Sequence, residues 1–219
     1  MPDLILQHWT GEIDELGARS SANLAAYAGR IGADYRLLRG DVFRPGLASP
    51  CQKLHMLDAE FDGYDWVLMV DMDMFAVRDL AENVFTEVSG TGLFSEYTAG
   101  VFRNCRSRHP TLTDARWAYW GGAIWRLSRE LRQRLRAHIR EAELAPFSGN
   151  YNDEGIMHRL ACLAKIPQDR LPQRWCQCNY LPEPGRAAMI HVRTKVTPTG
   201  PKRPKIDNYR DLCGRGVLE

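Results

Sequence analysis

The stretch DWVLMVDMDMF, residues 65–75, decides the fold expected for this chain. Its residues from Trp66 to Val70 carry no charge, and two aspartates, Asp71 and Asp73, then follow one residue apart. A short strand that is apolar throughout is typical of a central parallel strand covered on both faces. Open α/β sheets bind their ligands beyond the carboxyl ends of such strands, which is where the two aspartates are predicted to lie.

The two aspartates are placed so that they could share one cation. Side chains alternate along an extended chain, so Asp71 and Asp73 point to the same side. Two carboxylates this close repel each other, and a divalent metal ion removes that repulsion. Oxygen ligands suit Mg²⁺ or Mn²⁺, which often join a few carboxylates to phosphates. The alternative is a solvated strand end with two ordinary acids, and a D-x-D pair by itself favours that alternative because it is short and common.

Strands and helices are predicted to alternate along the first half of the chain. In order, we expect a strand over 3–9, a helix over 20–32, a strand over 34–40, a helix over 49–61 and the apolar strand over 65–71. Ser20 or Ser21 is the predicted cap of the first helix, and Gly32 its end. Ser49 is the predicted cap of the second helix, with Pro50 at its first helical position. The alternation predicts a doubly wound, mostly parallel sheet flanked by helices.

The second half of the chain is less regular. We expect strands over 91–97, 119–128 and 187–192, and helices over 128–144 and 152–164. Ser128 is the predicted cap of the first of these helices, which is basic and has one apolar stripe. Residues 194–209 are rich in Pro, Gly and Lys. We expect a loop there that becomes ordered only when a ligand binds.

The composition limits the classes of function. A chain of 219 residues suits one α/β domain, and 44% apolar with 26% charged residues is ordinary for a globular protein. The formal net charge of +2 does not call for a nucleic-acid partner. No uncharged run approaches the about 18–20 residues that span a bilayer, and the N-terminus lacks the basic segment of a signal peptide. We therefore expect a cytoplasmic protein.

The six cysteines are expected to be reduced thiols in that compartment. Cys176 and Cys178, with Cys162 and Cys213, could bind zinc, but a C-x-C pair is not the usual C-x2-C spacing of zinc sites. The alternative is that these cysteines are small buried hydrophobic side chains.

The stretch DWVLMVDMDMF resembles the D-x-D segment of GT-A glycosyltransferases, which hold a nucleotide-sugar diphosphate through a divalent metal ion. Five further segments are similar to parts of that family and follow its order: SSANLAAYAGRIGADYRLLRG (20–40), SPCQKLHML (49–57), YWGGAIWRLSREL (119–131), NDEGIMHRL (152–160) and MIHV (189–192). The resemblance covers roughly residues 3–195. It implies one GT-A, Rossmann-like α/β domain over 1–195, with a nucleotide-binding half (1–90), an acceptor half (91–195) and then a Pro/Lys-rich tail (196–219).

The resemblance also implies roles for the matching residues. Asp71, Asp73 and His191 would bind the metal ion, which would be Mn²⁺ or Mg²⁺. The residues near the nucleotide-sugar, a UDP- or GDP-sugar, would be Gln7, His8, Trp9, Thr10, Lys53, Asp71 and Lys195. The spacing after the histidine departs from the family, so Arg193, Lys195 and Lys202 all stay open as the cation that touches phosphate. Outside this family, His191 would be an ordinary histidine with one hydrogen bond.

The acceptor side is expected to supply a general base. Asp153 and Glu154 are the candidates, because a helix N-terminus stabilises their ionised forms and an inverting transfer needs one carboxylate to deprotonate the acceptor. Both could equally be ordinary acids of a first helical turn, and retaining relatives also carry an acid here. Gly121 and Gly122 would allow close approach of a sugar, and Trp120 is the expected platform for it. Inversion is weakly favoured over retention.

The acceptor itself would be a glycan, a lipid-linked sugar or a protein. The basic helix over 128–144 is either a solvated amphipathic helix or a surface that docks on an anionic membrane. In the second case the protein would lie at the inner membrane surface.

Three other classes are weighed against a glycosyltransferase. A haloacid dehalogenase would carry Thr or Val where this chain has Phe75. A sugar-1-phosphate nucleotidyltransferase normally has a dense Gly-rich basic loop after its first strand, and HWTGEIDELGARSS (8–21) lacks that density. A non-catalytic nucleotide- or carbohydrate-binding module would not need Asp71, Asp73 and His191 together.

Overall fold

The structure, a computed structural model, describes residues 1–88, 121–140, 152–166, 171–180, 186–197 and 199–219. The predicted strand over 91–97 and the predicted acceptor platform Trp120 lie outside these residues.

Among the described residues, the central sheet has four strands in the order β2-β1-β3-β5. These strands are β1 (Leu4–Trp9), β2 (Asp34–Arg39), β3 (Trp66–Val70) and β5 (Ile124–Ser128). β1 is parallel to both β2 and β3, whereas β5 runs antiparallel to β3. The prediction of a mostly parallel sheet in an α/β domain is confirmed, with the one antiparallel strand beside β3.

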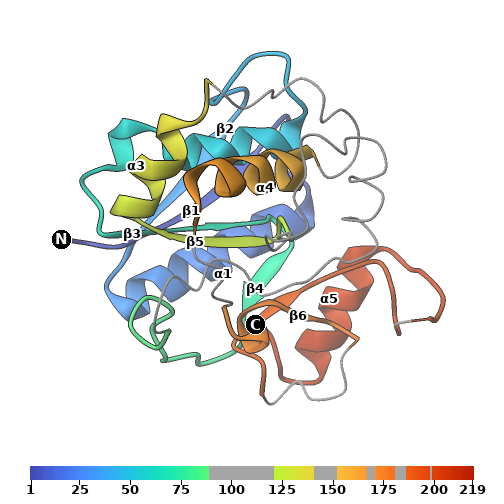
Figure 1. Cartoon of the computed structure of the whole chain (residues 1–219). Coiled ribbons are helices and arrows are strands. Elements are labelled where there is room, and N and C mark those ends of the chain that lie inside the picture. Colours follow the sequence, from blue (N-terminus) through green and yellow to red (C-terminus); the bar gives the residue numbers. More distant parts are fainter. Residues whose placement is uncertain (89–120, 141–151, 167–170, 181–185, 198) are drawn as a thin grey trace.

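Helices cover both faces of this sheet (Figure 1). One face is covered by η1 (Ser49–Leu57), α3 (Arg129–Ala137) and α4 (Asn152–Ala164), and the other by α1 (Glu15–Ile31). In β3, Val67 and Met69 pack in the first core, while Leu68 and Val70 pack in the second with α1. All four are fully buried, which explains why this strand is apolar throughout instead of alternating.

Helix α1 begins earlier than predicted. The side chain of Asp14 accepts a hydrogen bond from the Gly17 amide and caps the helix, so the prediction of Ser20 or Ser21 as cap is wrong. Ser20 is fully buried within the helix, where its hydroxyl donates to the Met74 carbonyl and ties α1 to the segment that follows Asp73. The predicted end is confirmed, because Gly32 adopts the left-handed conformation with φ of 71°.

The segment after residue 48 is a 3₁₀ helix with no side-chain cap. The prediction of Ser49 as a cap is wrong, because its hydroxyl is hydrogen-bonded to Thr10 at 2.8 Å instead. Pro50 does lie in the first turn, as predicted. A second short helix, η2 (Ala59–Phe61), follows.

A second sheet of three short strands has the order β4-β7-β6. Its strands are β4 (Met74–Ala76), β6 (Gln177–Cys178) and β7 (Met189–His191). β7 was predicted, but β4 and β6 are too short to show a hydrophobic period in the sequence. The antiparallel pairing of β4 with β7 sets Met74 opposite His191 and so brings the D-x-D segment beside the late histidine.

Helix α5 (Lys205–Gly214) lies beside the second sheet (Figure 1). Tyr209 and Leu212 pack in one core with Phe75 and Ile190, and the Phe75 and Tyr209 rings lie 4.8 Å apart. The prediction of a loop through residue 209 is therefore wrong from Lys205 onward, because this helix has its own apolar face. The domain boundary at residue 195 stays a prediction.

The arginines of α3 are engaged within the protein. Arg134 donates to the Ala164 carbonyl at the end of α4, and Arg136 donates to Asp62 at 2.7 Å. Ser128 caps the helix as predicted. These contacts account for the basic sequence of the helix without a membrane, so membrane contact stays a prediction. Within the described part of the chain, no helix combines the length and the apolar character needed to cross a bilayer.

Two further arrangements keep α1 and α3 against the sheet. Arg132, fully buried, donates to the carbonyls of Phe61 and Tyr64, which holds α3 over the end of η2. Tyr27 donates to the Glu82 carbonyl at 2.8 Å, and burial raises the pKa of this phenol far above its ordinary value. The framework around the candidate site is thus fixed by buried polar contacts as well as by apolar packing.

Candidate functional site

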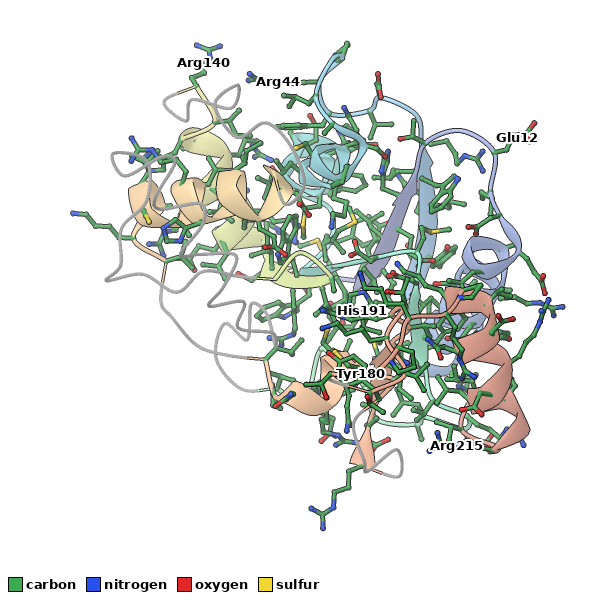
Figure 2. The ribbon with its side chains drawn as sticks, turned by 90° about the vertical axis from the view of Figure 1, so that its right-hand side faces the viewer. Glu12, Arg44, Arg140, Tyr180, His191 and Arg215 are labelled. Atoms are coloured by element: carbon green, nitrogen blue, oxygen red, sulfur yellow. The ribbon has the colours of Figure 1, made fainter. Side chains whose placement is uncertain are left out.

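A cavity of about 560 Å³ opens beyond the carboxyl ends of β1 and β3, where α/β sheets bind ligands. Residues from both sheets and from η1, α4 and α5 line it: His8, Trp9, Asp14, Leu16, Ser49, Pro50, Lys53, Asp71, Met72, Asp73, Gly122, Ala123, Asp153, Glu154, His191, Arg193, Thr194 and Lys205. Figure 2 shows His191 in the interior, close to α5, while Arg140 and Arg215 lie at the periphery.

Asp71, Asp73 and His191 form one group in this cavity. Each offers a ligand atom, and these atoms all lie within 4.8 Å of one another. Asp71 directly follows β3, Asp73 directly precedes β4, and His191 ends β7. The Val192 amide donates to the Asp73 carbonyl at 2.8 Å, which holds the two segments together. The structure thus brings together the three residues that the resemblance implied as metal ligands.

The donor set fits a hard divalent cation. Two carboxylates and one imidazole are suitable ligands for Mn²⁺, and the carboxylates for Mg²⁺. The side chains of Asp73 and His191 are 14% and 11% exposed and that of Asp71 is 30% exposed, so the group is enclosed but reachable from the cavity. Among the described residues this is the one such group, and it contains no cysteine. Cys176 and Cys178 are buried, and neither belongs to this group.

Internal cations hold Asp73 ionised. His191 Nε2 lies 3.2 Å from its Oδ1, and Lys205 Nζ donates to its Oδ2. Burial alone would raise the pKa of Asp73, but the charges and hydrogen bonds of His191 and Lys205 outweigh burial and hold the pKa well below its ordinary range. In return, Asp73 raises the pKa of His191 well above its ordinary value, although burial opposes this.

Asp71 has the opposite balance. Burial and the nearby Asp73 carboxylate raise its pKa, while Lys53 lowers it less than the other two raise it. A cation placed between the two aspartates would oppose both causes of the upward shift. The group is therefore electrostatically matched to a positive ligand.

Lys53 lines the cavity with a buried side chain and does not lie on a solvated helix face. Its side chain is 5% exposed, and Nζ lies 2.6 Å from Asp71 Oδ1, 2.7 Å from Asp153 Oδ2 and 2.6 Å from the Gly122 carbonyl oxygen. Nζ is also 5.0 Å from the centre of the Trp125 ring. Burial lowers the pKa of Lys53, but Asp153 and Asp71 outweigh it and raise the pKa above the ordinary lysine value. Lys53 is a buried cation that joins η1, β3 and α4.

Asp153 and Glu154 line the cavity from the first turn of α4. Both are nearly buried, at 4% and 6% exposure. Glu154 Oε1 accepts the Gly122 amide at 2.9 Å. A Cβ atom on Gly122 would lie 2.4 Å from Asp153 Oδ2, so only glycine leaves room for this acid. Gly122 was expected to make room for a sugar, and in the structure it makes room for Asp153.

The residues predicted near the nucleotide divide into two groups. His8 and Trp9 line the cavity, whereas Gln7 and Thr10 do not. Gln7 is fully buried and donates to Ser20 Oγ and to the Asp71 carbonyl, so it positions the backbone of Asp71. Thr10 is hydrogen-bonded to Ser49. Of the predicted acceptor pair, Gly122 lines the cavity, and Gly121 accepts the Trp125 indole N–H at 3.1 Å.

His8 lines the cavity and is hydrogen-bonded to the backbone. Its Nε2 lies 2.7 Å from the Gly40 carbonyl, which can only accept, so Nε2 carries the proton. Burial lowers the pKa of His8, with Lys53 and His55 contributing in the same direction.

The basic residues around the cavity differ from the prediction. Lys195 does not line the cavity. Its backbone pairs with that of Lys202 in an isolated antiparallel bridge, and its carbonyl accepts a hydrogen bond from the Asn179 side-chain amide. Arg193 and Lys205 line the cavity instead. Arg193 was one of the three open candidates, and its Nε lies 3.3 Å from His191 Nδ1. Lys205 was missed, because it was placed in a loop and its contact with Asp73 spans 132 positions of the sequence.

Three solved structures with folds similar to this chain are glycosyltransferases. No family model and no curated protein sequence matches the chain. A glycosyltransferase involved in glycosylating the major capsid of PBCV-1 has 10% identity and a TM-score of 0.56, over 98% of this chain and all of that one. The galactosyltransferase LgtC, bound to donor and acceptor sugar analogues, has 12% identity and a TM-score of 0.58, over 97% and 95%.

The bifunctional glycosyltransferase WbbM, in its apo form, has 14% identity and a TM-score of 0.59, over 96% of this chain and 49% of WbbM. The chain has a glycosyltransferase fold. At 10–14% identity the likeness concerns the fold, so the chemistry has to be argued from the cavity of this chain.

Proposed function

We propose that this protein is a metal-dependent glycosyltransferase that takes its sugar from a UDP- or GDP-sugar. The observation that carries the proposal is the group of Asp71, Asp73 and His191, whose ligand atoms lie within 4.8 Å of one another in a cavity at the carboxyl end of β3. The glycosyltransferase fold of the similar structures supports it. The acceptor would be a glycan, a lipid-linked sugar or a protein.

In this proposal Asp71, Asp73 and His191 hold Mn²⁺ or Mg²⁺. The bound cation would neutralise charge that develops on the leaving nucleoside diphosphate. Lys205 and Arg193 line the same cavity, and we assign them, in place of Lys195, to the diphosphate. Two cationic side chains suit a group that carries several negative charges.

The sugar and the acceptor are assigned to the side of the cavity formed by α4. Asp153 and Glu154 lie there, and one of them would take the acceptor proton if the transfer inverts the anomeric carbon. Lys53 holds one oxygen of Asp153 at 2.7 Å, which fixes the orientation of this carboxylate. Trp9 and His8 lie at the end of β1 and are assigned to the base or ribose.

Thermal unfolding with UDP, GDP, CDP, dTDP and ADP, each with and without Mn²⁺, tests the proposal. A ligand that binds only the folded state at 100 times its Kd stabilises it by about 2.7 kcal/mol, which raises Tm by about 5–11 °C in a chain of this size. We expect such a rise for UDP or GDP only when Mn²⁺ is present. The absence of any metal-dependent rise would count against the function proposed.

The nucleotide that raises Tm then defines the donor to use in a transfer assay. Release of that nucleoside diphosphate from a matching nucleotide-sugar, dependent on Mn²⁺ or Mg²⁺ and increased by an acceptor, is the expected activity. Formation of a nucleotide-sugar from a sugar phosphate and a nucleoside triphosphate would instead identify a nucleotidyltransferase.

A further inference from the structure

Lys205 occupies an oxygen of the candidate metal site. Its Nζ donates to Asp73 Oδ2, and His191 Nε2 lies 3.2 Å from Asp73 Oδ1. Oδ2 of Asp73 is therefore already paired with the Lys205 ammonium group, whereas Oδ1 lies near the His191 ring. A divalent cation bound through Oδ2 has to compete with that ammonium group.

The backbone of Lys205 is fixed by its helix. The neighbouring Asn208 is buried and donates to the Arg193 carbonyl at 2.6 Å, and Tyr209 and Leu212 pack in the core beneath. The Lys205 side chain is itself 40% exposed and extends over a flexible four-carbon stem. The ammonium group can therefore leave Asp73 while α5 stays in place.

We propose that Lys205 is a built-in counter-ion that competes with the divalent cation for Asp73, and that a nucleoside diphosphate relieves this competition by giving the ammonium group a new partner. The inference rests on the function proposed above. Lys205 lines the cavity beside Arg193, so an anionic ligand there lies within reach of its ammonium group. Lys205 would thus couple the binding of the cation to the binding of the nucleotide.

Coupling of this kind has a definite thermodynamic signature. If the nucleotide tightens cation binding by some factor, the cation must tighten nucleotide binding by the same factor. A charge-assisted hydrogen bond at a partly exposed lysine should set that factor at about tenfold, equivalent to about 1.4 kcal/mol. The cation alone should then bind weakly to the wild-type protein.

Mn²⁺ binding to the purified full chain, followed by the EPR signal of the free ion, tests the inference. The variants are Lys205→Met, which keeps the stem and removes the charge, and Lys205→Arg, which keeps the charge. Lys202→Met is the matched control, because Lys202 is an exposed lysine of the same segment that does not line the cavity. Thermal unfolding of each variant checks that it is folded.

Without nucleotide, we expect Lys205→Met to bind Mn²⁺ about tenfold more tightly than wild type, and Lys205→Arg and Lys202→Met to stay within about twofold of it. The coupling factor is the Mn²⁺ dissociation constant without nucleotide divided by that with UDP or GDP. This factor should be about tenfold smaller in Lys205→Met than in wild type. Equal or weaker Mn²⁺ binding by Lys205→Met without nucleotide would overturn the inference.

The two arms separate this inference from the proposed function. If no nucleoside diphosphate binds the wild-type protein with Mn²⁺, the proposed function fails, but the arm without nucleotide still decides whether Lys205 competes for Asp73. If neither wild type nor Lys205→Met binds Mn²⁺ under any condition, the cation site and the inference both fall.

Discussion

Replacing Lys53 by Met should expose how strongly the candidate site depends on its buried cation. Lys53 lies 2.6 Å from Asp71 and 2.7 Å from Asp153, and its side chain and that of Asp153 are 5% and 6% exposed. Removing one partner of a buried ion pair costs about 3–5 kcal/mol, because the other charge stays buried and uncompensated. Asp71 is 30% exposed and can be solvated, so we expect the lower end, about 3 kcal/mol.

The loss in Lys53→Met should depend on pH, with a sign that can be worked out. In wild type the pKa of Lys53 is raised in the folded state, so its own contribution to stability is constant near neutral pH and falls only at high pH. Without Lys53, the pKa of Asp71, already raised by burial, should rise further in the folded state. An acid whose pKa is raised in the folded state stabilises that state as the pH falls. The variant should therefore recover part of its stability when the pH is lowered from 8 to 5.

Urea denaturation of wild type and Lys53→Met at pH 5 and pH 8, in the same buffer strength, measures both effects. We expect a difference in unfolding free energy of about 3 kcal/mol at pH 8, or about 6–12 °C in Tm, and a smaller difference at pH 5. The double variant Lys53→Met with Asp153→Asn should be more stable at pH 8 than Lys53→Met alone. A loss below about 1 kcal/mol, or a loss equal at both pH values, would refute the reasoning.

Three further predictions concern the cavity. Asp73→Ala should abolish the Mn²⁺-dependent rise in Tm with nucleotide while unfolding stays cooperative, and an unchanged rise would remove Asp73 from the cation site. Gly122→Ala should lower the free energy of unfolding, measured in urea, by about 1–3 kcal/mol, because its Cβ would lie 2.4 Å from Asp153 Oδ2 and Asp153 is held by Lys53. This loss should be smaller in an Asp153→Ala background. Asp153→Asn should lower turnover while nucleotide binding by calorimetry stays within about twofold of wild type, and unchanged turnover would exclude Asp153 as base.

The elements with strong local signals could be predicted from the sequence. β3 is recognisable because burial on both faces makes it apolar throughout, and Gly32 marks the end of α1 because it adopts positive φ. The three cation-site candidates, Asp71, Asp73 and His191, could be named from the order of motifs along the chain. Their meeting in space depends on the pairing of β4 with β7, which only the folded chain shows.

Features that depend on distant contacts could not be predicted. The cap of α1 is Asp14 and not Ser20, and Ser20 lies buried within the helix, where its hydroxyl donates to the Met74 carbonyl. Lys205 looks like one of several lysines in a Pro-rich tail. Only the packing of Tyr209 and Leu212 shows that it begins a helix, and only the fold brings it to Asp73.

The cavity carries two kinds of internal counter-ion, and burial distinguishes them. Lys53, at 5% side-chain exposure, is held by Asp71, Asp153 and the Gly122 carbonyl, so it is a permanent part of the site. Lys205, at 40% exposure, reaches Asp73 from the solvent side and can exchange partners. A site with several acids needs positive charge at all times to stay folded, but it can bind a cation only if some of that charge can leave. Dividing the task between a buried and an exposed lysine satisfies both requirements, which is why the variants of Lys53 should change stability and those of Lys205 should change ligand coupling.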